Sequence, residues 1–184
     1  LRANHELSFY RQVNQEDEMM ARGFAAHKAH LTPVESRPHS DREASTAAGR
    51  FVGDISSAQT WQALQNHPEA VLVDVRTRAE WTFVGGPDLA TLGKSVIQVE
   101  WQLFPNMDRN PRFVRELQTR GITPHQPVYL ICRSGIRSRD AAELLAERGY
   151  TTYSVTDGFE GPINDHGHRG ASGWRAAQLP WKQG

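Results

Sequence analysis

The only cysteine of the chain, Cys132, lies in a stretch whose residues suit the binding of an anion, "LICRSGIRSRD". Gly135 permits a tight turn, and Arg133 and Arg137 bring positive charge and forked N–H donors that match sulfonate, phosphate or carboxylate oxygens. Backbone amides of such a turn can point inward together, and the helix expected to begin near Ser138 adds the positive end of its dipole. Each feature stabilises a thiolate relative to a thiol. The stretch therefore predicts a reactive nucleophile beside an anion-binding loop, rather than an inert buried thiol.

The spacing between the cysteine and the second arginine separates two reaction classes. Cysteine phosphatases require Cys-x5-Arg, but in this chain that position is Ser138 and the arginine comes one residue earlier. A loop that is one residue shorter suits attack on a sulfane sulfur, which leaves a persulfide whose terminal sulfur lies within the ring of amides. We therefore expect Cys132 to be the catalytic residue. The expected substrate-binding residues are the rest of the loop, namely Arg133, Ser134, Gly135, Ile136, Arg137 and Ser138.

Short apolar runs alternate with amphipathic segments from residue 51 onward. This alternation predicts an α/β fold with a mainly parallel central sheet and helices on both faces. The expected strands are 51–56, 70–76, 95–101, 127–132 and 151–158, and the expected helices are one capped by Ser56 or Ser57, a short one near 79–81, and those within 110–121 and 139–149. In open α/β sheets, ligands bind beyond the carboxyl ends of the strands, and Cys132 stands at such an end.

Four segments, in the same order, resemble the rhodanese (thiosulfate:cyanide sulfurtransferase) superfamily. They are the loop "CRSGIRS", the strand and turn "VLVDVRTRAEW", the glycine-rich "VTDGFEG", and the tail "GWRAAQLPW" that is similar to small single-domain bacterial members. The resemblance implies that Cys132 carries a persulfide between a donor such as thiosulfate and an acceptor such as cyanide or a thiol, without a cofactor. One segment, "VGGPDLATLGKSV", departs from the family pattern "GHIxGA" and is expected to shape a different entrance for the acceptor.

Three charged residues lie at or just after the end of the strand that carries the "DVR" segment, namely Asp74, Arg76 and Glu80. Charged residues at strand ends usually pair with one another, so we expect an ion-paired support beneath the loop rather than direct catalysis. The glycine-rich segment is expected to line the pocket opposite the cysteine loop, through Gly158, Phe159, Glu160 and Gly161.

Composition limits the remaining functions. Lysine plus arginine equals aspartate plus glutamate, 21 against 21, so no basic excess points to nucleic acid. No apolar run is long enough to span a membrane, residues 1–30 lack the apolar core of a signal peptide, and a lone cysteine cannot form an internal disulfide. We expect a cytoplasmic protein. Because the first residue is Leu1 and not methionine, the question of an upstream targeting segment stays open. The partners expected are a small sulfur donor and acceptor, or a protein thiol.

The polar, proline-containing stretch before Phe51 indicates an N-terminal extension and linker over residues 1–50, followed by the rhodanese-like domain over 51–184. No metal is expected, because neither the "DHGH" segment nor the pair His27 and His30 supplies a complete ligand set. Trp61 and Trp101 are expected in the core. Trp174 and Trp181 are expected to fasten the tail to the domain.

Two alternatives to the sulfurtransferase stay open at this point. A cysteine phosphatase or arsenate reductase would hydrolyse an aryl phosphate or turn over arsenate. A sulfur-carrier or redox-sensing module with a protein partner would load a persulfide stably but show negligible turnover with small acceptors.

Overall fold

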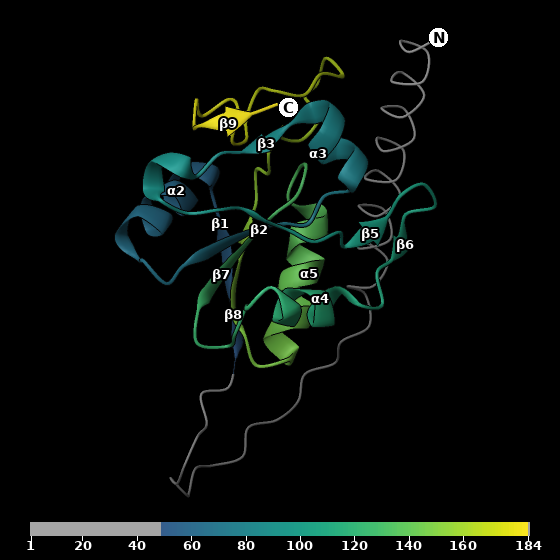
Figure 1. The fold of residues 1–184 in the computed structure, drawn as a ribbon. Coiled ribbons are helices and arrows are strands. Elements are labelled where there is room, and N and C mark those ends of the chain that lie inside the picture. The colour runs from purple at the N-terminus through teal and green to yellow at the C-terminus, as the bar shows by residue number, and fades with distance from the viewer. Residues whose placement is uncertain (1–48, 184) are drawn as a thin grey trace, which may run out of the picture. The chain divides into compact units, whose positions relative to one another are not determined.

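Five parallel strands form the central sheet in the computed structural model, which describes residues 49–183 (Figure 1). The strand order is β1-β8-β7-β2-β4, and every neighbouring pair runs parallel. The bounds are Arg50–Ile55 for β1, Val71–Asp74 for β2, Ile97–Gln98 for β4, Pro127–Ile131 for β7 and Thr151–Val155 for β8. Strand β7 lies in the middle of the sheet, as its continuous apolar run predicts for a strand buried on both faces. The predicted α/β class and mainly parallel sheet are confirmed.

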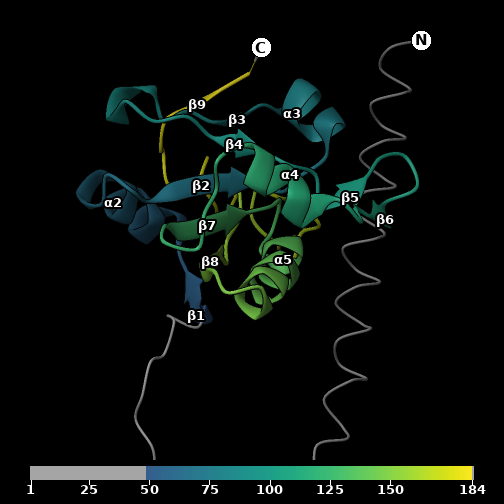
Figure 2. The same ribbon diagram turned by 60° about the horizontal axis from the view of Figure 1, so that its bottom comes forward.

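Helices cover both faces of this sheet (Figures 1 and 2). They are α2 (Ser57–Asn66), α3 (Arg78–Val84), α4 (Phe113–Thr119) and α5 (Ile136–Glu147), with a short 3₁₀ turn at Ala90–Leu92. One continuous hydrophobic cluster joins the sheet to α4 and α5, with Phe113, Leu117 and Leu145 fully buried in it. Helix α2 lies on the opposite side of the sheet (Figure 1). Because successive side chains of a strand point to opposite faces, the continuous apolar runs of β2 and β7 supply apolar residues to both faces.

Two helices begin with side-chain caps that bear on the site. Ser56 and Gln59 form a capping box at the start of α2, and Thr77 and Glu80 form one at the start of α3. Helix α5 begins earlier than expected, at Ile136, because the chain enters the helix directly after the left-handed turn at Gly135. Ile136, Arg137 and Ser138, which the sequence assigned to the loop, therefore already belong to its first helical turn.

The strand expected over 95–101 was too long. Only Ile97–Gln98 pairs in the sheet, and the chain then turns away into the antiparallel pair β5 (Gln102–Leu103) and β6 (Asp108–Arg109). Sequence analysis also missed the antiparallel pair β3 (Gly86–Pro87) and β9 (Trp181–Lys182), which ties the tail to the segment after α3. Isolated two-residue strands have no periodicity to detect.

Three of the five tryptophans lie in two groups. Trp101 is buried in the main cluster, with its ring 5.0 Å from that of Phe113. Trp174 is fully buried, 5.9 Å from the ring of the half-buried Trp61, and thus holds the tail against α2. In the described part of the chain, no helix is long and apolar enough to cross a membrane. The predicted extension over 1–50 lies outside the described residues, apart from its last two.

Candidate active site

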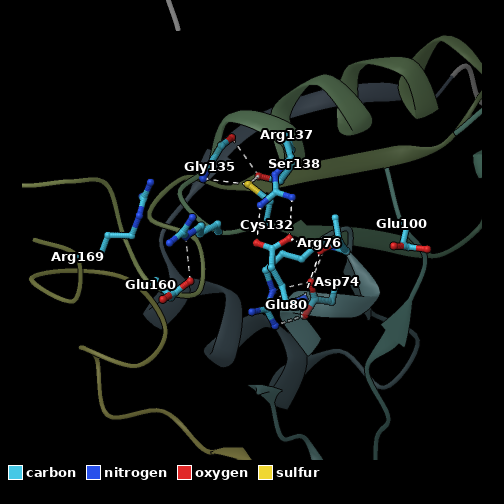
Figure 3. A network of polar contacts seen from close by, with 12 residues as sticks. Asp74, Arg76, Glu80, Glu100, Cys132, Gly135, Arg137, Ser138, Glu160 and Arg169 are labelled. Carbon is cyan, nitrogen blue, oxygen red and sulfur yellow. Dashed lines mark hydrogen bonds and ion pairs between the residues drawn. The ribbon is translucent and has the colours of Figure 1, made fainter. Parts of the chain in front are cut away.

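Cys132 directly follows the central strand β7, at the carboxyl end of the sheet. Its side chain is 1% exposed, and its sulfur lies close to two hydrogen-bond donors (Figure 3). The Gly135 N–H donates to Sγ over 3.1 Å, and the Ser138 hydroxyl lies 3.4 Å from Sγ. The sulfur is thus held by polar donors from the start of α5, although its residue also borders the hydrophobic cluster.

The turn after Cys132 is fixed by backbone packing against the segment that follows β8. Gly135 has a φ of 97°, and a Cβ built there would overlap the carbonyl of Thr156. Gly158 approaches the loop from the other side, so that a Cβ there would overlap the carbonyl of Arg133. Only glycine allows this approach at either position. The loop and the segment after β8 consequently have one fixed relative placement.

Backbone hydrogen bonds complete this attachment. The Phe159 N–H donates to the carbonyl oxygen of Cys132 over 2.8 Å, and the Glu160 N–H donates to that of Arg133 over 3.0 Å. The glycine-rich segment was expected to line a pocket. The structure places Gly158 and Phe159 against the loop itself, while Glu160 also borders a cavity described below.

Ser154, a residue that sequence analysis missed, takes part in the contacts around the sulfur. It is fully buried on β8, and its Oγ lies 3.1 Å from the Oγ of Ser138. The Ser138 hydroxyl also lies within hydrogen-bond distance of the Gly135 carbonyl, at 3.0 Å. If Ser154 donates to Ser138, the proton of Ser138 points to Sγ or to that carbonyl. The sequence did offer one signal for Ser154, since it is a serine near the carboxyl end of an expected strand.

Both loop arginines are buried and each binds a carboxylate. Arg137 donates from its two terminal nitrogens to the two oxygens of Glu80, over 2.9 and 2.8 Å (Figure 3). Arg133 donates from Nε to Glu160 over 3.0 Å. Each guanidinium therefore has a counter-charge within the protein. The expectation that these arginines contact the substrate stays a prediction.

The three residues expected to support the loop form two separate ion pairs. Arg76 binds Asp74, with 2.6 Å between Nη2 and Oδ2, and donates to the Gly85 carbonyl over 2.8 Å. Its guanidinium also covers the ring of Phe159, 4.2 Å from the centroid. Glu80 instead reaches the loop through Arg137, and all of these side chains are buried.

The Glu80 carboxylate is held in its charged form. Burial alone would raise its pKa, but Arg137, Arg76 and a hydrogen bond from the Thr77 N–H lower the pKa to about 2. For Arg76, burial lowers the pKa, but Asp74 outweighs it, helped by Glu80 and Glu160, so that the net pKa is raised. Glu80 and Arg76 therefore carry full charges beneath the loop at neutral pH.

Two cavities open near this end of the molecule. The larger, of about 600 Å³, lies between α3, β4 and α4, with Arg78, Trp81 and Glu100 among its lining residues, and no loop residue borders it. The smaller, of about 390 Å³, borders the ion pair of Glu160 and is otherwise lined by the tail. It is lined by Glu160, Arg169, Gly170, Arg175, Ala176 and Trp181.

Metal-ligating side chains do not cluster in the described residues: no group of three or more His, Cys, Asp or Glu could hold an ion there. In the "DHGH" segment, the backbone N–H groups of His166 and His168 donate to the Asn164 side chain, which shapes a turn. His27 and His30 lie outside the described residues. The chemistry of the site is thus that of a buried cysteine sulfur held by backbone and hydroxyl donors.

Comparisons with known proteins place this geometry in a family. The family model described as "STR4 middle domain" matches residues 52–184. An uncharacterised protein of Rickettsia conorii is 38% identical over 132 residues, which is 71% of this chain and 98% of that protein. A thiosulfate sulfurtransferase, GlpE, of Glaesserella parasuis is 31% identical over 109 residues, 59% of this chain and 83% of that enzyme.

Solved structures show the same fold. The crystal structure of Rv0390 from M. tuberculosis has a TM-score of 0.69 and 51% identity, and the match covers 73% of this chain and all of that one. A homodimeric polysulfide-sulfur transferase from Wolinella succinogenes has a TM-score of 0.51 and 23% identity, over 73% of this chain and 80% of its own.

Proposed function

The chain belongs to the rhodanese-like domain superfamily, and from this membership we propose that it is a thiosulfate sulfurtransferase acting through a persulfide on Cys132. The reaction moves one sulfane sulfur from the donor to a thiophilic acceptor, cyanide or a thiol. The observation that carries the proposal is the position of Sγ, which accepts from the Gly135 N–H and lies beside the Ser138 hydroxyl at the carboxyl end of the central strand.

The first half-reaction forms the persulfide. The Cys132 thiolate attacks the outer sulfur of thiosulfate, the new S–S bond forms, and the bond to the sulfonate sulfur breaks with its electron pair leaving on sulfite. The resulting persulfide anion is stabilised by donors at the start of α5, namely the loop amides, the Ser138 hydroxyl and the positive end of the helix dipole. The attacking group in this proposal is the thiolate, so the step as written requires no general base.

The second half-reaction regenerates the thiolate. A nucleophilic acceptor attacks the terminal sulfur of the persulfide, and the electron pair of the broken S–S bond returns to Cys132. Because one product leaves before the acceptor reacts, the kinetics are of the ping-pong type. No electrons enter or leave the overall reaction.

The buried ion pairs position the loop in this proposal. Arg137 fastens the first turn of α5 to α3 through Glu80, so the two donors to Sγ keep their place when the charge of the sulfur changes. Arg133 attaches the loop to the segment after β8 through Glu160. Groups that are already oriented before the reaction stabilise its charges without a reorganisation cost.

Intact mass spectrometry after thiosulfate treatment tests the proposal. We expect a gain of one sulfur atom that dithiothreitol removes, and no gain in Cys132→Ser. Turnover is then measured with cyanide as acceptor. An unmodified wild-type mass would overturn the persulfide mechanism, whereas loading without turnover would indicate a carrier module.

A further inference from the structure

Phe159 joins the tail of the chain, residues 169–183, to the backbone of the nucleophile. Its N–H donates to the Cys132 carbonyl over 2.8 Å, and its own carbonyl accepts from the Arg175 N–H over 3.2 Å. One residue thus binds the start of the cysteine loop with its donor and the tail with its acceptor. A displacement of the tail at this point would reach the backbone of Cys132 through a single intervening residue.

The ring of Phe159 also contacts the tail. It is fully buried, and the indole of Trp181 meets it edge to face, with 6.1 Å between the centroids and 74° between the planes. The guanidinium of Arg76 covers the same ring, 4.2 Å from its centroid. Edge-to-face ring pairs and cations over aromatic rings are both attractive arrangements. Trp181 is therefore the contribution of the tail to the placement of this ring.

Trp181 is itself held in place by the tail and by β3. The Pro180 carbonyl directly before it accepts from the Trp174 indole N–H and from the Asp88 N–H, over 2.8 and 2.9 Å. Strand β9 pairs with β3 (Figure 1), and the guanidinium of Arg175 lies 4.3 Å from the centroid of the indole. The Trp181 side chain is nevertheless 38% exposed, so it can be replaced without opening the main core.

We propose that Trp181 is a positioning residue for Cys132, because its indole holds the ring of Phe159 and Phe159 holds the carbonyl of the nucleophile. This inference rests on the proposed function, in which the rate of sulfur transfer depends on where Sγ lies relative to its donors. The backbone of Cys132 determines the direction of its side chain. A displacement of about 1 Å can cost about 100-fold in rate, even when the residue that causes it touches no substrate.

Single-turnover loading of Cys132 with thiosulfate, followed by mass spectrometry, tests this role. We expect Trp181→Leu to lower the maximal loading rate about tenfold, a part of the loss typical of a 1 Å misplacement. The thiosulfate concentration that gives half of the maximal rate should not change, because the indole is not assigned to substrate binding. Trp181→Phe keeps an aromatic ring against Phe159 and should restore most of the rate.

The matched control is Phe51→Leu. Phe51 is a partly buried aromatic residue of β1 that also lies under a guanidinium, that of Arg139, but it takes no part in the contacts of Phe159. This variant should load at the wild-type rate. Urea unfolding of every variant shows how much of any slowing comes from unfolded protein, and the loading rates are compared for the folded fraction.

A double-mutant cycle tests the route through the ring. Phe159→Leu removes the ring but keeps the N–H that binds the Cys132 carbonyl. If Trp181 acts through this ring, adding Trp181→Leu to Phe159→Leu should slow loading little further, because residues that act through one contact are not additive. Losses that multiply would overturn the proposed route.

Hydrogen exchange of the Phe159 amide, measured by NMR, gives a readout that needs no reaction. In Trp181→Leu this amide should exchange about two- to tenfold faster relative to that of Leu130, a fully buried residue of β7, which corresponds to the loss of one edge-to-face ring pair. The ratio to Leu130 corrects for any change in global stability. Trp181→Phe and Phe51→Leu should keep the wild-type ratio.

The two hypotheses fail in different ways. If thiosulfate does not load the wild type, the sulfurtransferase proposal is wrong, and the exchange ratio still decides whether Trp181 holds Phe159. If the wild type loads, the positioning role is overturned by a wild-type rate in Trp181→Leu, by equal slowing in Phe51→Leu or by an unchanged exchange ratio. A higher half-saturating thiosulfate concentration at an unchanged maximal rate would instead assign Trp181 to donor binding.

Discussion

Arg137 and Glu80, 57 positions apart in the sequence, form a two-bond ion pair that joins the first turn of α5 to the first turn of α3. Both side chains are 1% exposed. Breaking a buried pair by removing one partner costs about 3–5 kcal/mol, because the remaining charge is left in the interior. The pair therefore couples the stability of the domain to the placement of the cysteine loop.

The decrease in the free energy of unfolding at acid pH should depend on Glu80. The pKa of this carboxyl is about 2 in the folded protein, against an ordinary value of 4.5. Its contribution to the free energy of unfolding is fully present above pH 4.5 and is lost as the pH falls toward 2. Urea unfolding across this range should show Glu80→Gln to be less stable at neutral pH and to decline less steeply toward acid. Glu147→Gln, on the exposed end of α5, should follow the wild type.

Two sulfur donors of different charge can show whether Arg137 positions the loop or binds the departing sulfite. If the arginine positions the loop, Arg137→Lys should slow persulfide formation by on the order of 100-fold, the loss typical of a misplacement of about 1 Å. The loss should be equal for thiosulfate and for an uncharged organic trisulfide. A loss confined to thiosulfate would instead assign the arginine to the departing sulfite. Arg139→Lys, on the exposed face of the same helix, is the matched control.

The close approach at Gly135 should be intolerant of a methyl group. Gly135→Ala combines a left-handed backbone with overlap on the Thr156 carbonyl, so we expect a loss of both stability and persulfide loading. Gly121→Ala supplies the control, because its φ of 81° imposes a similar backbone cost but a Cβ there meets open space. The left-handed conformation alone costs about 1–2 kcal/mol. Urea unfolding of the two variants should therefore differ by the effect of the overlap, and equal losses would contradict it.

The hydroxyl groups around Sγ should contribute to the rate of loading. Ser138→Ala removes a donor 3.4 Å from the sulfur, and we expect single-turnover loading with thiosulfate to slow by about tenfold. Ser154→Ala acts only through Ser138 and should slow it by about two- to fivefold. Ser95→Ala, in an exposed loop, serves as control. Unchanged loading in Ser138→Ala would show that the amides alone stabilise the charge.

The parts of the fold that follow from sequence are those with a strong local signal. The apolar run of β7, the glycine turn and the amphipathic α5 predict where Cys132 stands, because each is encoded within a few residues. The partners of the charged residues could not be predicted in the same way. Asp74, Arg76 and Glu80 were expected to support the loop, but pairing of Glu80 with Arg137 depends on how α3 and α5 pack, which is a long-range property.

The contacts of the tail could not be predicted from local sequence either. Trp181 was expected to fasten the tail, but its partner strand β3 is only two residues long and has no pattern of its own. Ser154 was missed for a related reason, since its contact with Ser138 requires β8 to lie beside β7. Contacts between residues on neighbouring strands can be predicted only when the strand order is known.

The close approaches of Gly135 to Thr156 and of Gly158 to Arg133 also bear on attempts to transplant this chemistry. The turn after Cys132 keeps its shape because a second backbone segment, residues 156–160, presses against it and donates to its carbonyls. Grafting the seven-residue motif "CRSGIRS" into another α/β scaffold would carry over the nucleophile. It would leave out residues 156–160, which hold the loop in its conformation. A successful graft would have to move both segments as one rigid part.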